Sequence, residues 1–352
     1  MQPDLILQED SFCLEFRSIS ELVPFDEFPQ LVNATVGDNG YVLQERIIVP
    51  LRMVGQAHNF SARTIAPLRC NQPLIFIGHP DLPIQYASII ARPEKGKSRV
   101  EKSDTAIKVT TDGINLLYSA PIFSAQGKNG HSFIAAFDKI SEVLQSFPMR
   151  EAAIARTWLF MNNILKDYEK LNMAREHFFA KWCSASNHFI PASTGIQGHT
   201  IGNEALAVEF CAFSGDNITI RQISSPLQNE PTTYGKLFSR AVAVQFPHCK
   251  LLFISGTAAI DKTGSSVYVG NFESQMTFTL EVVSAILSQE KGSFPNVAQA
   301  IVYLKRSEDM DSCLRILDEA GFPRARALFQ LDVDVCRNNL LCEIEVTAVT
   351  TL

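Results

Sequence analysis

The sequence predicts an α+β fold in which two tandem β-β-α-β-α-β-β units pack as a pseudo-symmetric pair, with an N-terminal extension. The first observation is a strand pattern that occurs twice, at residues 207–213 and 343–349, with alternating apolar and polar side chains. The second is an amphipathic helical pattern earlier in each copy, at residues 133–146 and 272–289. Duplicated units of this kind form mixed sheets with helices on one face.

The elements of the two units correspond in order, over about residues 98–214 and 230–352. In the first unit we expect strands at 116–123, 155–161, 191–194 and 207–213 around the helix at 133–146. In the second unit we expect strands at 251–260, 298–304, 323–326 and 343–349 around the helix at 272–289. The predicted domains are therefore 98–229, a degenerate unit plus connector, and 230–352, the catalytic unit.

Residues 1–97 show no recognisable copy of the unit. They contain short strand-like runs at 41–50, 74–78 and 84–91, separated by Pro and Gly turns. We interpret them as a strand-rich extension that packs on the first unit.

Composition excludes several classes of function. The chain has 352 residues, 46% of them hydrophobic, and a net charge of −6, with one short Lys/Arg stretch at 95–102. This balance argues against nucleic acid as a partner. No apolar run approaches the roughly 20 residues of a membrane span, and the N-terminus lacks the pattern of a signal peptide. Eight scattered cysteines without a C-x-x-C pair indicate reduced thiols and a cytoplasmic location.

The sequence predicts neither a metal nor a cofactor. Its seven histidines lie far apart, without the spacing of metal ligands. Glycine-rich nucleotide-binding motifs and the G-x-S-x-G motif of serine hydrolases are also absent from the sequence.

The two copies of the last strand differ at one informative position. When the two strands are aligned, Glu345 corresponds to Glu209, but Glu343 corresponds to Ala207. Two carboxylates at i and i+2 face the same side of a strand and repel each other unless a function requires them there. A solvated outer face is the simpler alternative, but the loss of one carboxylate from the first copy predicts one polar site per chain, at the seam between the halves.

Arginines at the strand starts suit recognition of an anion. When the two copies are aligned, Arg326 corresponds to Thr194 of the first copy. Arg240 follows Tyr234 at the start of the second unit. A guanidinium offers paired donors to a carboxylate, so several arginines near one glutamate predict an anionic ligand with an acid/base partner. The alternative is an Arg326–Glu343 ion pair that holds the strands together.

The second unit resembles the RidA/YjgF deaminases, whose fold is also called chorismate mutase-like. The motifs that carry this resemblance are Phe-Ser-Arg-Ala-Val at 238–242, Ser-Gly-Thr-Ala at 255–258, Pro-Arg-Ala-Arg at 323–326 and Glu-Ile-Glu at 343–345. The resemblance implies that Arg326 anchors a carboxylate and that Glu343 is the catalytic carboxylate. Phe238 and Arg240 replace a Tyr and a Gln of that family, which favours a larger, dianionic substrate over plain imine hydrolysis.

The whole chain is similar to the chorismatases, which join a degenerate first copy to a RidA-like second one. The shared segments are 156–158, 193–196, 234–241 and 255–258. The resemblance implies chorismate as substrate, with Arg326 on one carboxylate and Arg240 or Arg156 on the other. The remaining expected substrate-binding residues are Tyr234, Lys236, Thr194, Gly195 and Gly256.

The implied chemistry is protonation of the enol ether by Glu343, with release of pyruvate. The resemblance associates a cysteine seven residues before the glutamate, here Cys336, with the branch that forms 3-hydroxybenzoate, possibly with some 4-hydroxybenzoate. Three alternatives stay open: hydrolysis to a trans-dihydrodiol, a RidA-like enamine or imine hydrolase, and a binding protein without turnover. The oligomeric state, monomer or homo-oligomer, is also left open by the sequence.

Overall fold

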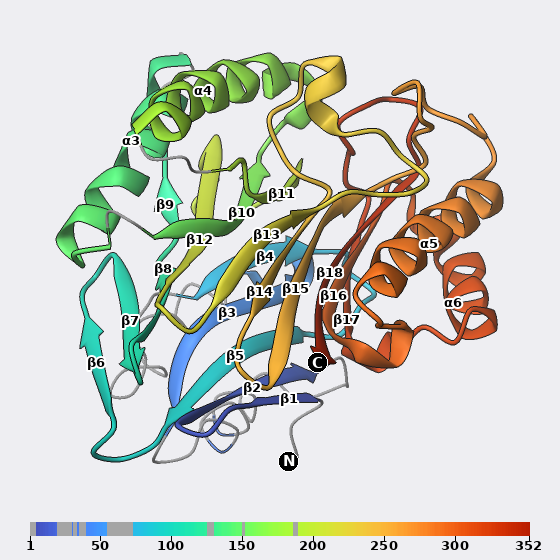
Figure 1. Ribbon diagram of the computed structural model, residues 1–352. Helices are drawn as coiled ribbons and strands as arrows, with labels where there is room; N and C mark the ends of the chain where they lie inside the picture. Colours follow the sequence, from blue (N-terminus) through green and yellow to red (C-terminus); the bar gives the residue numbers. More distant parts are fainter. Residues whose placement is uncertain are drawn as a thin grey trace.

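Three β-sheets from one chain meet around a common hydrophobic core in the computed structural model of the protein (Figure 1). The structure describes residues 5–19, 30, 34, 40–54, 73–124, 130–149, 152–185 and 189–352. The predicted α+β class with tandem units is confirmed, since the second and third sheets each combine mixed strands with helices.

The N-terminal sheet has the strand order β1-β2-β5-β3-β4. Its elements are β1 (Leu5–Gln8), β2 (Phe12–Ile19), β3 (Tyr41–Pro50), the 3-10 turn η1 (Leu51–Met53), β4 (Leu74–Gly78) and β5 (Gln85–Pro93).

The second sheet has the order β11-β10-β12-β8-β7-β6, and β9 also pairs with β12. Its strands are β6 (Ser98–Lys102), β7 (Ala106–Thr111), β8 (Ile114–Ser119), β9 (Ile122–Phe123), β10 (Ala153–Met161), β11 (Ala192–Gln197) and β12 (Leu206–Ser214). Helices α3 (Gly130–Ser146) and α4 (Ile164–Ala185) cover it, as the upper left of Figure 1 shows. Phe137, Ile140 and Phe178 from these helices belong to the same buried cluster as Leu159 and Val208 of the sheet.

The third sheet has the order β13-β14-β15-β18-β16-β17. Its strands are β13 (Thr219–Ile223), β14 (Ala241–Gln245), β15 (Cys249–Thr257), β16 (Val297–Leu304), β17 (Ala327–Leu331) and β18 (Cys342–Thr351). Its helices and 3-10 turns are η2 (Pro231–Tyr234), α5 (Phe272–Gln289), η3 (Phe294–Asn296), η4 (Ser307–Asp309), α6 (Met310–Glu319) and η5 (Arg324–Arg326).

Helix α5 forms over the predicted residues for local reasons. Asn271 caps it by accepting the Ser274 N–H at 3.0 Å. Phe272, Met276 and Leu280, four residues apart, then face the core and are buried.

The N-terminal sheet has the same strand topology as the other two sheets. The orders β2-β5-β3-β4, β8-β12-β10-β11 and β15-β18-β16-β17 are equivalent, and each ends in one parallel pair. The central antiparallel pair of every sheet also carries a β-bulge at the same place, where the register skips Leu43, Ala155 and Ala298. This shared irregularity shows that the sheet of the unit recurs in the N-terminal extension, where the sequence has no obvious copy of the unit.

The N-terminal sheet contacts both other sheets and not the first unit alone. Nε2 of Gln299 on β16 donates to the carbonyls of Arg17 and Ser88 at 3.0 and 2.7 Å. Arg46 on β3 reaches Glu209 and Glu345, one carboxylate from each of the other sheets. The three sheets therefore share their buried polar contacts as well as their core.

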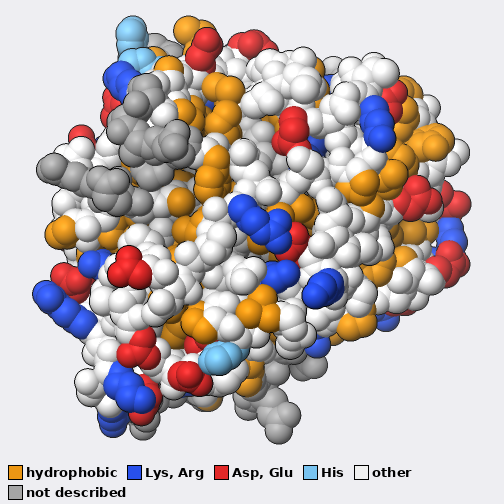
Figure 2. Space-filling view, viewed as in Figure 1, with side chains coloured by type: hydrophobic (Ala, Val, Ile, Leu, Met, Phe, Trp, Pro, Cys, Tyr) orange, Lys and Arg blue, Asp and Glu red, His pale blue; other side chains and the backbone are white. Residues whose placement is uncertain are grey.

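The surface mixes both signs of charge. On the face that Figure 2 shows, basic side chains are interspersed with acidic ones. Within the described ranges, the structure has no helix of the length and apolarity needed to cross a membrane.

Candidate active site

Glu343 occupies a buried position near the start of β18, opposite Tyr303 of β16. Counted from the shared bulge, the equivalent residues of the other two sheets are Ala207 and Gln85. Gln85 is used structurally: its side chain donates to the carbonyl of Phe329 at 2.9 Å and accepts the N–H of Phe329 at 2.7 Å. Of these three related positions, only 343 carries an ionisable group.

The surroundings of Glu343 keep its carboxyl group protonated. Burial and, to a smaller extent, the neighbouring Glu345 carboxylate raise the pKa of Glu343 to about 8, although Arg156 and Arg175 act in the opposite direction. A carboxyl group with such a pKa carries its proton at neutral pH and can donate it to a substrate.

The carboxyl group of Glu343 faces the seam between the second and third sheets. The Thr194 hydroxyl of β11 accepts the N–H of Gly256 on β15 at 3.0 Å, and the Ser193 N–H donates to the Ser255 hydroxyl at 2.8 Å. A Cβ on Gly256 would lie 1.9 Å from Oε1 of Glu343, so the backbone at residue 256 directly abuts the carboxyl group.

Arg240 and Tyr234 form a cationic side of the site, and the backbone just before η2 holds Arg240 in place. Arg240 donates through Nε and Nη2 to the Asn229 carbonyl at 3.0 and 2.7 Å, and through Nη2 to the Tyr234 hydroxyl at 2.9 Å. Gly235, with φ 75°, turns the chain after Tyr234. Burial lowers the pKa of Arg240, and the nearby Arg337 guanidinium contributes to the lowering. Two guanidinium groups this close favour an anionic ligand.

Helix α4 supplies a second set of polar groups. Arg175 is buried and donates to the Ser193 hydroxyl at 2.9 Å. The Tyr168 hydroxyl lies within hydrogen-bonding reach of Arg175 and of the Cys336 thiol. The ammonium group of Lys236 lies 4.9 Å from the centre of the Tyr168 ring. The degenerate unit thus contributes side chains to the same site.

Cys336 is a neutral thiol at this site. Burial raises its pKa to about 12, and the Glu343 carboxyl adds to the increase. A thiol with this pKa stays un-ionised at neutral pH.

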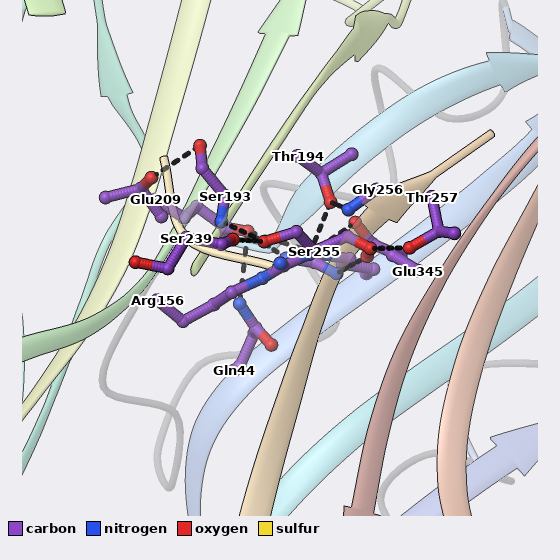
Figure 3. Close-up of polar contacts among 12 residues, drawn as sticks. Gln44, Arg156, Ser193, Thr194, Glu209, Ser239, Ser255, Gly256, Thr257 and Glu345 are labelled. Atoms are coloured by element: carbon purple, nitrogen blue, oxygen red, sulfur yellow. Dashed lines mark hydrogen bonds and ion pairs between the residues drawn. The ribbon is translucent and has the colours of Figure 1, made fainter. Parts of the chain in front are cut away.

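Arg156 and Thr194 lie on the paired strands β10 and β11 and contact each other (Figure 3). Nη2 of Arg156 donates to Oε2 of Glu345 at 2.9 Å and also to the Thr194 hydroxyl. Its Nη2 thus pairs with a carboxylate of the protein and holds Thr194, while its Nη1 is buried without a hydrogen-bond partner among the described residues, so a role of Arg156 in substrate binding stays a prediction.

Arg326 lies at a different seam. Its Nη1 donates to the carbonyls of Pro295 and Val297 at 3.0 and 2.8 Å, and Val297 pairs with Ala348, at the other end of β18 from Glu343. The turn η5 that holds Arg326 packs against β2 of the N-terminal sheet. The structure therefore corrects both the placement of Arg326 beside Glu343 and the alternative of an ion pair between them.

Most of the predicted site residues meet at one seam. The structure brings together Glu343, Cys336, Arg240, Tyr234, Lys236, Thr194, Gly195 and Gly256. Gly195 joins them through α4, since a Cβ there would lie 3.4 Å from Nη2 of Arg175.

Sequence reasoning missed Arg175, Tyr168 and Arg337. The seven-residue spacing of Tyr168 and Arg175, which places them on one face of a helix, was the available signal. Among the described residues, no group of three or more His, Cys, Asp or Glu side chains is placed to hold a metal ion.

Known proteins resemble this chain over its C-terminal part and over its whole length. Residues 228–350 match the family model described as Endoribonuclease L-PSP. A 3-hydroxybenzoate synthase of Streptomyces hygroscopicus is 27% identical over 309 residues, which cover 78% of this chain and 87% of that protein.

The solved structures show the fold. A crystal structure of a chorismatase superposes with a TM-score of 0.70 and 19% identity, over 97% of this chain and 100% of the other. The resemblance predicted from the sequence is confirmed: this chain has the fold of a chorismatase and carries a RidA-like unit in its C-terminal part.

Proposed function

We propose that the chain is an enzyme that removes the enolpyruvyl group of chorismate as pyruvate and forms 3-hydroxybenzoate, with some 4-hydroxybenzoate as a by-product. The observation that carries the proposal is Glu343, a carboxyl group with a pKa of about 8 that faces a seam lined by arginines and tyrosines. The similarity to a 3-hydroxybenzoate synthase over most of the chain supports the substrate and the product.

The two carboxylates of chorismate match two groups of cations in the site. We assign one carboxylate to Arg240 and Tyr234, with Arg337 adding positive charge. We assign the other to Arg175 on α4, on the side of Tyr168 and Cys336. Recognition from two sides would fix the enol ether between them, next to Glu343.

Glu343 acts as the general acid. Its proton adds to the methylene carbon of the enol ether, which leaves an oxocarbenium ion at the neighbouring carbon. Capture of this cation by the adjacent ring hydroxyl leads to 3-hydroxybenzoate and pyruvate without net use of water. Capture by water gives a trans-dihydrodiol and pyruvate. General acid catalysis typically contributes about 10²- to 10⁴-fold, so orientation by the arginines must supply the remainder.

Incubation with chorismate tests the proposal. The purified protein, without added metal or cofactor, is expected to release pyruvate in equal amount to an aromatic hydroxybenzoate, measured by an enzymatic pyruvate assay and chromatography. Release of pyruvate with a non-aromatic diol would support the same class of enzyme, with the dihydrodiol as product in place of 3-hydroxybenzoate. Unchanged chorismate would reject the proposal and favour enamine or imine substrates, in keeping with the RidA-like C-terminal part.

The rate of the reaction is expected to fall as the pH rises through about 8. Glu343 must be protonated to act, and its pKa of about 8 means that the active form is complete below this pH and is lost above it. The measurement is kcat/KM between pH 6 and 10, because this parameter reports the titration of the free protein, with the folded state checked by circular dichroism at each pH. A kcat/KM that stays constant up to pH 10 would contradict the role of Glu343 as the acid.

Replacing Cys336 by alanine is expected to move the product from 3-hydroxybenzoate towards the dihydrodiol. The thiol is neutral and packs against hydrophobic residues of two core clusters, so its removal opens space for a water molecule near the oxocarbenium ion. The readout is the product ratio by chromatography. As a control, Cys183→Ala alters a cysteine on α4 that has no contact with Glu343. An unchanged ratio in Cys336→Ala would show that Cys336 does not select the branch.

A further inference from the structure

Arg46, from the N-terminal sheet, joins all three sheets at their centre. It is buried on β3, and its guanidinium contacts Glu209 of β12 at 3.0 Å through Nη2 and Glu345 of β18 at 3.2 Å through Nη1. The same guanidinium lies 4.6 Å from the ring centre of Trp158. Neither the predicted sequence motifs nor the proposed mechanism uses this residue.

A continuous set of polar contacts leads from Arg46 to the wall of the active site. Oε1 of Glu345 binds Arg46, while Oε2 accepts Arg156 at 2.9 Å. Arg156 also donates to the Thr194 hydroxyl, which accepts the N–H of Gly256 at 3.0 Å. Figure 3 shows Arg156, Thr194, Gly256 and Glu345 in this arrangement. Gly256 is the residue whose backbone abuts Glu343.

The buried charges in this set balance. Two guanidinium groups, of Arg46 and Arg156, face two carboxylates, of Glu209 and Glu345. If Arg46 were absent, Glu345 and Glu209 would have only Arg156 as a cation in this group. With Arg46 gone, the two carboxylates would compete for Arg156, so Glu345 would have to move, and this would disturb Arg156 and Thr194.

We propose that Arg46 is a positioning residue of the Glu343 site: it fixes Glu345, so that Arg156 can hold Thr194 and the Gly256 backbone against the catalytic carboxyl group. The expected fall in kcat rests on the proposed function. The expected change in the position and titration of Glu343 rests on the contacts alone. It assigns the N-terminal sheet a part in the site, although no residue of that sheet is expected to touch the substrate.

The charges around Glu343 determine the sign of the effect on its titration. The ionisable groups near it on the surrounding elements are Glu345 and Cys342 on β18, Arg156 on β10, Arg175 and Tyr168 on α4, Tyr303 on β16, and Cys336 before β18. Without Arg46, the negative charge of Glu345 is compensated by Arg156 alone. The uncompensated charge of Glu345 favours the protonated form of Glu343. Arg46→Met should therefore move the titration of Glu343 to higher pH.

The test compares Arg46→Met with Arg17→Met in the full-length protein. Arg17 is a matched control because it is also a buried arginine of the N-terminal sheet, paired with Glu15 of the same strand. We expect kcat with chorismate to fall by about 10- to 100-fold in Arg46→Met, with KM changed by less than about threefold, because a misplaced acid costs rate more than affinity. Arg17→Met should retain kcat.

A second readout does not depend on turnover. Infrared difference spectroscopy, with Glu343→Gln to assign the carboxyl band, follows the titration of Glu343 in each variant. If wild-type protein leaves chorismate unchanged, the proposed function fails, but the shift of this titration in Arg46→Met still tests the positioning role. Should Arg46→Met not fold, Arg46→Met/Glu209→Gln removes one cation and one anion together and takes its place. A folded variant with wild-type kcat and an unshifted Glu343 titration would overturn the inference.

Discussion

Glu343→Gln is expected to abolish turnover of chorismate while the protein still folds and binds the substrate. The amide has nearly the same size as the carboxyl group but cannot give up a proton as an acid, so the loss should reach about 10²- to 10⁴-fold or more. Steady-state kinetics and calorimetric binding of chorismate separate the two effects. Glu204→Gln, which alters a carboxylate bonded to Thr200 outside the site, should leave kcat unchanged. Full activity in Glu343→Gln would exclude the mechanism.

The same substitution should change the pH dependence of stability. The folded-state pKa of Glu343, about 8, lies above its ordinary value of 4.5. Folded protein therefore binds a proton that the unfolded chain releases, and the stability contributed by this proton is lost as the pH rises from about 4.5 through 8. Glutamine at position 343 does not titrate, so the variant does not lose stability in this way as the pH rises. The melting temperature of Glu343→Gln should exceed that of wild type more at pH 9 than at pH 5, and parallel curves would contradict the raised pKa.

Local features of the fold were predictable from the sequence because they depend on spacing. The predicted helix at 272–289 coincides with α5, where the cap at Asn271 and apolar residues four apart act within one segment. The repeated last strand was equally visible, because Glu209 and Glu345 still share its alternating pattern.

The likeness of the N-terminal sheet to the other two sheets was hidden in the sequence because it is geometric. Strand order and the shared bulge depend on pairing between distant residues, such as Ile48 with Gln85, and not on shared side chains. At the position of Glu343 the N-terminal sheet has Gln85, and at the position of Arg156 it has Gln44. Equivalent folds without equivalent residues leave no pattern to recognise in one sequence.

One of the predicted cations, Arg326, lies away from Glu343 for a related reason. Divergence between the copies pointed to Glu343, because Ala207 replaces it in the first copy. Arg326 was grouped with Glu343 because both belong to one unit. In the folded chain, however, the strand beside that of Glu343, β15, meets the edge strand of the second sheet, while η5 with Arg326 meets the N-terminal sheet. The second sheet and α4 provide Thr194 and Arg175 instead.

Gly256→Ala is expected to remove most of the activity at little cost in stability. The added methyl carbon would lie 1.9 Å from Oε1 of Glu343 and 3.1 Å from Cγ2 of Thr194. The nearer atom is the end of a flexible side chain, so the protein can relieve the overlap by rotating Glu343. That rotation moves the acid away from its position, and a displacement of about 1 Å at a reacting group can cost about 100-fold in rate.

Gly202→Ala is a matched control, because its methyl carbon would lie 1.8 Å from Oε1 of Glu204, again the end of a glutamate side chain. Both variants make the same chemical change against the same kind of neighbour, and only one of the two glutamates faces the seam with Thr194. We expect similar melting temperatures for the two proteins and loss of kcat in Gly256→Ala alone. Equal kcat in both would mean that the position of Glu343 beside residue 256 does not matter for the reaction, whereas an equal loss in both would point to a general effect of the substitutions on the fold.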